Sequence, residues 1–125
     1  MPASILIVDD SALTRAVIAK TVRLTKFKDS EIREAPNGLE AIKALRLAPA
    51  DLVFSDINMP VMNGLVFLDT KNQDGTIRDI PVIVISSDSS SGRAEQLKQR
   101  GVKEIVSKPF TPESIEKLMS GVLEG

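Results

Sequence analysis

Three short runs of consecutive apolar residues constrain the fold of this chain most strongly. They are Ile5–Val8, Leu52–Phe54 and Val82–Ile85, and they consist of β-branched, aliphatic and aromatic residues. Strands that are apolar on both faces belong in the middle of a parallel sheet that is covered by helices on both sides. The runs therefore predict an α/β fold built around a parallel sheet.

Two further segments predict the edges of this sheet. Glu31–Ala35 is more polar and Glu104–Val106 is short, so each is expected to form an edge strand. Helical patterns fill the gaps, and the order is a strand followed by a helix, repeated five times. Short loops and right-handed crossovers then favour a doubly wound, five-stranded open sheet. The 125 residues suit one domain, so we expect a single domain over residues 1–125 with no output domain.

The expected helices carry capping residues and apolar stripes. Asn37 with Glu40 resembles a capping box for the second helix, and Asn63 predicts the start of the third. Gly101 is expected to end the fourth helix, and Thr111-Pro112 to open the fifth. The stripe expected to be buried in the first helix is Leu13, Ala16, Val17, Thr21 and Leu24. In the second helix it is Leu39, Ile42 and Leu45; in the fifth it is Ile115, Leu118, Met119 and Val122.

Composition excludes several kinds of chemistry. The chain contains no Cys and no His, so it has no thiolate nucleophile and lacks the commonest neutral-pH proton shuttle. A formal net charge of −1 gives no basic excess for binding nucleic acid. The N-terminus does not resemble a signal peptide, and no apolar run approaches the length that spans a membrane. We therefore expect a cytoplasmic protein without membrane insertion, whose chemistry uses carboxylates, hydroxyls, Lys and metal ions.

Polar residues follow four of the five expected strands. Asp9 and Asp10 follow the first, Asp56 the third, Ser86 the fourth and Lys108 the fifth. In doubly wound sheets, sites form outside the carboxyl ends of the strands, so these side chains should share one rim. Three carboxylates repel one another unless a cation is present, and oxygen ligands suit Mg²⁺. Because Asp can also accept a phosphoryl group covalently, the set favours phosphoryl chemistry.

Each of these features also has a plainer interpretation. The paired acids could cap a helix, Asp56–Pro60 could form a simple turn, and Lys108 could be a solvated side chain. The serine-rich stretch from Ser86 to Ser91 could be only a polar loop. Taken together the plain interpretations are poor, because all four features follow expected strands on one rim.

These motifs resemble the receiver domains of bacterial response regulators, especially single-domain regulators of the CheY type. They are Val-Asp-Asp-Ser at 8–11, Asp-Ile-Asn-Met-Pro-Val-Met-Asn-Gly at 56–64, Ser86, and Lys-Pro-Phe at 108–110. The resemblance runs from Ile5 to about Leu123. It implies a flavodoxin-like sheet with strand order 2-1-3-4-5 and a cis bond between Lys108 and Pro109.

The resemblance also implies roles for single residues. Asp56 would accept the phosphoryl group from a histidine kinase or a phosphotransfer protein. Side chains of Asp10 and Asp56 and the backbone carbonyl of Asn58 would bind Mg²⁺, and Asp9 would act on the metal through water. Ser86 would donate a hydrogen bond to the phosphoryl group, and Lys108 would pair with it.

Output and lifetime of the phosphorylated form are further implications. A downstream target protein would bind a face made by the fourth helix, fifth strand and fifth helix, with Ala94, Lys98, Val102, Lys103, Ile105 and Leu118. The family commonly has Tyr or Phe where Ile105 stands, and that ring turns inward on activation, so this switch would be absent or altered. Asn58 and Asp88 would border the path of attacking water, and both are small and polar. We therefore expect spontaneous loss of the phosphoryl group.

Other functions fit the sequence less well. A haloacid-dehalogenase-type phosphatase would need a second carboxylate where Asn58 stands, and a flavodoxin-like cofactor site would not place Asp9-Asp10 against a phosphate. A receiver that is never phosphorylated is disfavoured, because every acceptor-site residue is present. The main hypothesis is a signalling module, with chemotaxis as one candidate pathway and a phosphorelay intermediate or phosphate sink as the alternative. It would promote only its own phosphorylation and dephosphorylation.

Overall fold

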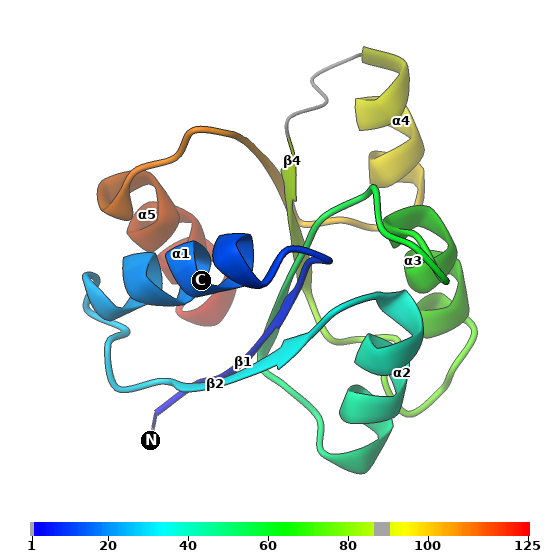
Figure 1. The fold of residues 1–125 in the computed structure, drawn as a ribbon, viewed down its shortest axis with the longest axis horizontal. Coiled ribbons are helices and arrows are strands. Elements are labelled where there is room, and N and C mark those ends of the chain that lie inside the picture. The colour runs from blue at the N-terminus through cyan, green and yellow to red at the C-terminus, as the bar shows by residue number, and fades with distance from the viewer. Residues whose placement is uncertain (1, 87–90) are drawn as a thin grey trace.

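A five-stranded parallel sheet lies in the middle of the molecule (Figure 1). The computed structural model describes residues 2–86 and 91–125. The strands are β1 (Ser4–Val8), β2 (Glu31–Ala35), β3 (Leu52–Ser55), β4 (Val82–Ser86) and β5 (Glu104–Ser107). Their order in the sheet is β2-β1-β3-β4-β5, which confirms the predicted topology and both predicted edges.

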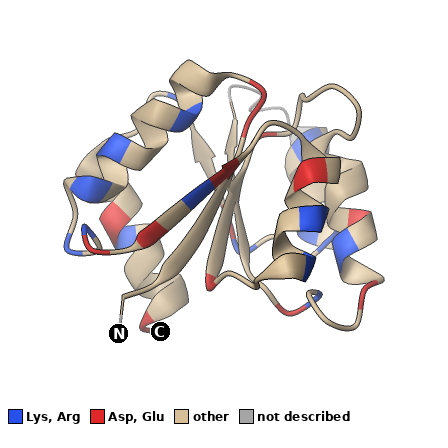
Figure 2. Ribbon diagram, turned by 60° about the horizontal axis from the view of Figure 1, so that its bottom comes forward, with Lys and Arg blue, Asp and Glu red and all other residues tan. Residues whose placement is uncertain are grey.

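Five helices cover the two faces of this sheet. They are α1 (Ala12–Arg23), α2 (Gly38–Leu47), α3 (Gly64–Asn72), α4 (Ser91–Gln99) and α5 (Pro112–Leu123). Helices α1 and α5 lie on one face, and α2, α3 and α4 lie on the other (Figure 1). Acidic and basic positions are mixed over the helices of both layers (Figure 2).

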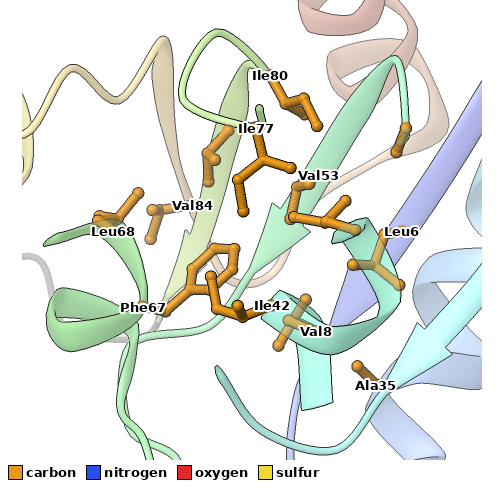
Figure 3. Close-up of a cluster of buried hydrophobic side chains, with 14 of the residues drawn as sticks. Leu6, Val8, Ala35, Ile42, Val53, Phe67, Leu68, Ile77, Ile80 and Val84 are labelled. Atoms are coloured by element: carbon orange, nitrogen blue, oxygen red, sulfur yellow. The ribbon is translucent and has the colours of Figure 1, made fainter. Parts of the chain in front are cut away.

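The central strands are buried on both faces, as their sequences predict. In β1, Leu6 and Val8 join the hydrophobic cluster beneath α2 and α3, whereas Ile5 and Ile7 join the cluster beneath α1 and α5. Figure 3 shows the first of these clusters, in which Phe67 of α3 lies among side chains from the strands. Each side of the sheet therefore has its own apolar core, and the strands are shared between them.

The register of the strands aligns their carboxyl ends. Val8, the last residue of β1, pairs with Ala35 of β2 and with Ser55, the last residue of β3. On the other side, Ser86 at the end of β4 pairs with Ser107 at the end of β5. The residues that follow these strands therefore emerge along a single edge of the sheet.

The predicted helix starts are confirmed. Asn37, Asn63 and Thr111 are N-caps whose side-chain oxygens accept hydrogen bonds from the backbone N–H three residues on. Thr111 also forms a reciprocal capping box with Ser114, and Pro112 occupies the first helical turn. Beyond α4, Gly101 has φ +80°, a left-handed conformation that favours Gly at a helix end.

The buried face predicted for the first helix is wrong. Leu13, Val17 and Leu24 are 76%, 48% and 65% exposed, and Ala16 is exposed as well. Of the predicted set only Thr21 is buried, alongside Ile18 and Val22. Apolar residues occur around much of this helix, but contact with the sheet buries only one stripe of them. The periodicity of the sequence therefore did not identify the buried stripe.

A smaller correction concerns α2. Leu39 is exposed, whereas Ala41, Ile42 and Leu45 are buried. In α5 the predicted stripe is confirmed: Ile115 and Met119 are fully buried, and Leu118 and Val122 pack partly buried against the same cluster. Within the described ranges 2–86 and 91–125, we find no helix that is both long and apolar enough to span a bilayer.

Candidate functional site

Three carboxylates meet at the carboxyl edge of the sheet. Asp9 and Asp10 directly follow β1, and Asp56 directly follows β3, the strand paired with β1. One carboxylate oxygen from each residue lies within 4.8 Å of the others. The structure thus brings together the acidic residues that the sequence predicted on one rim.

Lys108 reaches this acidic group from β5. Its Nζ lies 3.8 Å from Oδ2 of Asp9 and 3.9 Å from Oδ2 of Asp56. Its backbone N–H donates a hydrogen bond of 3.1 Å to the carbonyl of Ser86, which fixes the end of β5 to the end of β4. The bond between Lys108 and Pro109 is cis, as predicted. One ammonium group therefore lies beside two of the carboxylates.

Asp9 is the most buried of the three acids. Its Oδ1 accepts a hydrogen bond of 2.9 Å from the N–H of Ser11, and its own N–H donates to the carbonyl of Ala35 at 3.1 Å. Burial raises the pKa of the Asp9 carboxyl above its ordinary value. The Ser11 hydrogen bond opposes that rise, and the negative charge of Asp56 adds to it. A cation at the site would favour the ionised form of Asp9.

Asp56 is held at both its backbone and its side chain. Its N–H donates to the carbonyl of Val8 at 3.0 Å, and its carbonyl accepts from the hydroxyl of Ser55 at 2.8 Å. Its Oδ1 accepts a hydrogen bond of 2.7 Å from the N–H of Ile57. The second oxygen, Oδ2, is the one that faces Lys108. The two oxygens of this carboxylate thus have different surroundings.

Gly64 allows α3 to begin directly against the Asp56 peptide. Its N–H donates to the carbonyl of Ile57 at 2.7 Å. A Cβ atom at this position would lie only 2.5 Å from the backbone oxygen of Asp56. Any larger residue would therefore push the loop between β3 and α3 away from the sheet edge.

The remaining predicted residues occupy different parts of this edge and its surroundings. Ser86 is buried at the last position of β4, and Asn58 is exposed in the loop between β3 and α3. Ile105 lies in β5 and, with Val102, packs partly buried against the core cluster beneath α2 and α3. Asp88 lies outside the described residues. Ser86 and Ile105 thus belong to neighbouring strands that lead to and from α4.

The acidic group fits a hard divalent cation. Its ligands are carboxylate oxygens only, and Asp10 is exposed while Asp9 is buried. An exposed ligand leaves room for the water molecules that Mg²⁺ usually keeps. With Lys108 beside them, the carboxylates and a bound cation could balance the charge of an incoming phosphoryl group.

Arg15 is a contact that the sequence interpretation missed. Its Nη1 donates a hydrogen bond of 2.7 Å to the backbone carbonyl of Asp9, and its Nε lies 2.9 Å from Oε1 of Glu34 in β2. The sequence does contain a pair of opposite charges that could have indicated this contact. Arg15 lies in the first turns of the helix after Asp9, and Glu34 lies near the end of the neighbouring strand. Their partnership depends on the register between β1 and β2, which the motifs do not show even though the resemblance implies that these strands are adjacent.

Comparison with protein families agrees with this geometry. The model of the response regulator receiver domain matches residues 5–120. Among curated proteins, chemotaxis protein CheY1 of Helicobacter pylori is 32% identical over 120 residues, covering 95% of each chain. The two-component response regulator ORR6 of Oryza sativa subsp. japonica is 31% identical over 94% of this chain and 69% of the rice protein.

Solved structures show the same fold. Chemotaxis protein CheY4 of Vibrio cholerae superposes with a TM-score of 0.88 at 29% identity, covering 98% of this chain and 100% of that one. The receiver domain of sensor histidine kinase PA1611 from Pseudomonas aeruginosa PAO1 has a TM-score of 0.88 over the full length of both chains. It is 19% identical to this chain, which supports the fold only, and it is described with magnesium coordinated in its active-site cleft.

Proposed function

Because this chain belongs to the response regulator receiver domain family, we propose that its Asp56 accepts a phosphoryl group in a Mg²⁺-dependent step. The donor would be a partner histidine kinase or phosphotransfer protein, since the chain itself contains no His. The observation that carries the proposal is the meeting of Asp9, Asp10 and Asp56 within 4.8 Å, with Lys108 Nζ 3.9 Å from Asp56.

The two oxygens of Asp56 suggest how the step is oriented. Oδ1 is engaged by the N–H of Ile57, so Oδ2 is the better nucleophile toward phosphorus. As the new O–P bond forms, the P–N bond of the donor phosphohistidine breaks and its electron pair leaves with the nitrogen. A phosphoryl group on Oδ2 would lie beside the Lys108 ammonium, whose positive charge would pair with the negative charge of the phosphoryl oxygens.

The side chains of Asp10 and Asp56 would hold Mg²⁺ together with the backbone carbonyl of Asn58, and Asp9 would act on the cation through water. When bound, the cation supplies positive charge for the phosphoryl oxygens and offsets the repulsion among the three carboxylates. Membership of the receiver domain family and the grouping of the three acids support this assignment. Water attack on the phosphorylated residue would limit its lifetime, and no external substrate is part of the proposal.

Output would leave through the surface made by α4, β5 and α5. Ser86 and Lys108 would both be drawn toward the phosphoryl group, and Ser86 lies at the end of the strand that leads to α4. Ile105 has no hydroxyl and no ring, so it would serve as an apolar contact for the target protein. We also propose that residues 1–125 form a single domain and that the protein is cytoplasmic.

The acceptor is tested by intact-mass measurement after incubation with acetyl phosphate and Mg²⁺. Wild type should gain one phosphoryl group that is labile in acid and base, and Asp56→Asn should gain none. Asp29→Asn, a matched change at an exposed position, should behave as wild type. An equal adduct on Asp56→Asn would place the acceptor elsewhere.

The output surface is tested separately by backbone NMR with beryllofluoride as a phosphoryl mimic. Shifts should centre on residues 86–95 and extend to β5. If α4 stays silent while another face responds, the proposed surface is wrong.

A further inference from the structure

Arg15 is a charged side chain beside the acidic site that the proposed chemistry does not use. It lies in α1, about one turn beyond the Ser11 cap, and its side chain is only 17% exposed. The guanidinium bridges two other segments, with Nη1 on the backbone carbonyl of Asp9 at 2.7 Å and Nε on the Glu34 carboxylate at 2.9 Å. One side chain thus connects α1, the turn after β1, and β2.

This contact completes the anchoring of Asp9. The Asp9 N–H is held by the carbonyl of Ala35, and its Oδ1 by the N–H of Ser11. The Arg15 guanidinium holds the backbone carbonyl of Asp9, which would otherwise be free to rotate. Every backbone polar group of Asp9 is therefore fixed by a different segment.

The same contact holds the peptide plane that leads into Asp10. The carbonyl of Asp9 and the N–H of Asp10 belong to one planar peptide unit. Holding that carbonyl therefore fixes the plane from which the Asp10 Cα and side chain extend. Asp10 is exposed, unlike Asp9, so less packing is available to hold its carboxylate toward Asp56.

Electrostatics and positioning make opposite demands on Arg15. A positive charge next to three metal-binding carboxylates repels a divalent cation, so charge alone would make Arg15 unfavourable for Mg²⁺ binding. The ion pair with Glu34 offsets much of that repulsion. If Arg15 positions the acidic residues, it would raise the affinity for Mg²⁺ in spite of its own positive charge.

We propose that Arg15 is a positioning residue that orients the Asp9–Asp10 peptide and thereby raises the affinity of the acidic site for Mg²⁺. This inference rests on the Mg²⁺ site of the proposed function. Outer contacts that orient metal ligands commonly change affinity by about 10- to 100-fold when removed. Because Arg15 contacts the backbone carbonyl of Asp9 and not its carboxylate, we expect the lower end of that range.

The test is direct Mg²⁺ titration followed by backbone NMR, without any phosphodonor. Arg15→Met keeps the length of the side chain but removes its charge and donors. Its dissociation constant for Mg²⁺ should rise about tenfold, and the Asp10 amide should shift before Mg²⁺ is added. Arg15→Lys, which can still donate to the Asp9 carbonyl, should recover part of the affinity.

Arg23→Met is the matched control. Arg23 lies in the same helix and also donates to backbone carbonyls, those of Lys28 and Ser30, but at the end of α1 far from the site. Its removal should leave the Mg²⁺ dissociation constant unchanged, even if stability falls. With acetyl phosphate, the half-saturating Mg²⁺ concentration of Arg15→Met should rise, while its rate at saturating Mg²⁺ stays near the wild-type rate.

The outcomes separate this inference from the proposed function. Unchanged or tighter Mg²⁺ binding by Arg15→Met would overturn the positioning role and leave the acceptor site intact. Lower stability with unchanged affinity would show that Arg15 only joins α1 to β2. If wild type binds no Mg²⁺, both the metal site and the role of Arg15 are wrong.

Discussion

Helices α1 and α4 both connect to the acceptor edge, yet they are held in different ways. Helix α1 follows Asp9 and Asp10, begins at the Ser11 cap, and buries Ile18, Thr21 and Val22. Helix α4 leads away from Ser86 and, among its described side chains, buries only Leu97. The helix that follows Asp9 and Asp10 therefore buries three of its residues, whereas the helix that follows Ser86 buries one of its described side chains.

Two polar contacts connect α3 to the residue just beyond α4. Arg100, just beyond the helix, pairs with Asp69 of α3 at 2.9 Å, and its backbone carbonyl accepts a hydrogen bond from Asn72. Few buried apolar contacts are typical of segments that open at low free-energy cost. A modest interaction at Ser86 could then shift the position of α4, whereas the same force would not move α1. The contrast fits the proposal that the acidic site stays rigid while the surface around α4 responds.

The largest expected effect comes from matched truncations in the two helices. Ile18→Ala and Leu97→Ala each remove three carbon atoms from a fully buried side chain. Ile18→Ala should lower the free energy of unfolding by about 3 kcal/mol. Leu97→Ala should lower the free energy of unfolding by less, about 1–2 kcal/mol. The lost contacts cannot contribute more than the free energy with which α4 packs against the rest of the protein.

Urea denaturation and hydrogen exchange measure this pair of variants. In Leu97→Ala, amides of α4 should exchange much faster while those of the sheet stay protected. Equal destabilisation by the two truncations, with no local change in α4, would contradict the proposed difference between the helices.

Mg²⁺ should stabilise the acidic edge without tightening α4. Binding to the folded state alone stabilises by about 2.7 kcal/mol when free Mg²⁺ is 100 times its dissociation constant. Melting at low ionic strength, with and without Mg²⁺, should show a higher Tm for wild type. Asp10→Ala should lose most of that gain; an equal gain in this variant would argue against the site.

A smaller effect is expected from the link between α3 and α4. Arg100→Met removes the ion pair with Asp69, whose side chain is about half exposed, so the free energy of unfolding should fall by less than about 1 kcal/mol. Exchange of α4 amides should nevertheless accelerate. Lys98→Met, an exposed change in the same helix, is the control and should leave exchange unaltered.

The smallest expected effect is on the pH dependence of stability, and it comes from Asp74 in the loop after α3. Hydrogen bonds from Thr76 and Arg46 lower the pKa of Asp74 to about 2. A depressed pKa stabilises the folded state above the ordinary Asp value, and this contribution is lost as pH falls from about 4 to 2. Asp74→Asn should therefore flatten that part of the stability profile, measured by urea denaturation at each pH. The amides of α4 should exchange hydrogen as in wild type, because Asp74 joins α2 to the turn after α3. Faster exchange of these amides would show that the stability of α4 depends on this loop.

Much of the fold follows from local pattern. Runs that are apolar on both faces require a covered parallel sheet, and side chains such as Asn63 and Thr111 cap helices through neighbours three residues away. The candidate site was predictable for a related reason. Parallel strands end at one edge, so the polar residues placed after β1, β3 and β5 meet there, and this could be predicted without any knowledge of packing.

What the sequence left open depends on contacts between distant segments. The buried face of α1 was decided by the sheet and by α5, because the helix has more apolar residues than one stripe can bury. Val61, a β-branched residue, adopts φ +68°, and its neighbours Pro60 and Met62 are joined by a hydrogen bond of 2.7 Å across it. That conformation is unfavourable for Val, so only the surrounding loop between β3 and α3 can impose it.

The geometry of the acidic group divides in the same way. The presence of Asp9, Asp10 and Asp56 on one rim was determined by their positions after strands. The orientation of the Asp9–Asp10 peptide was decided by Arg15 and Glu34, which come from different elements and meet only because β2 lies beside β1. Local patterns specify which groups are present at an edge, whereas a hydrogen bond between remote segments needs the folded chain before its partners are close enough to form it.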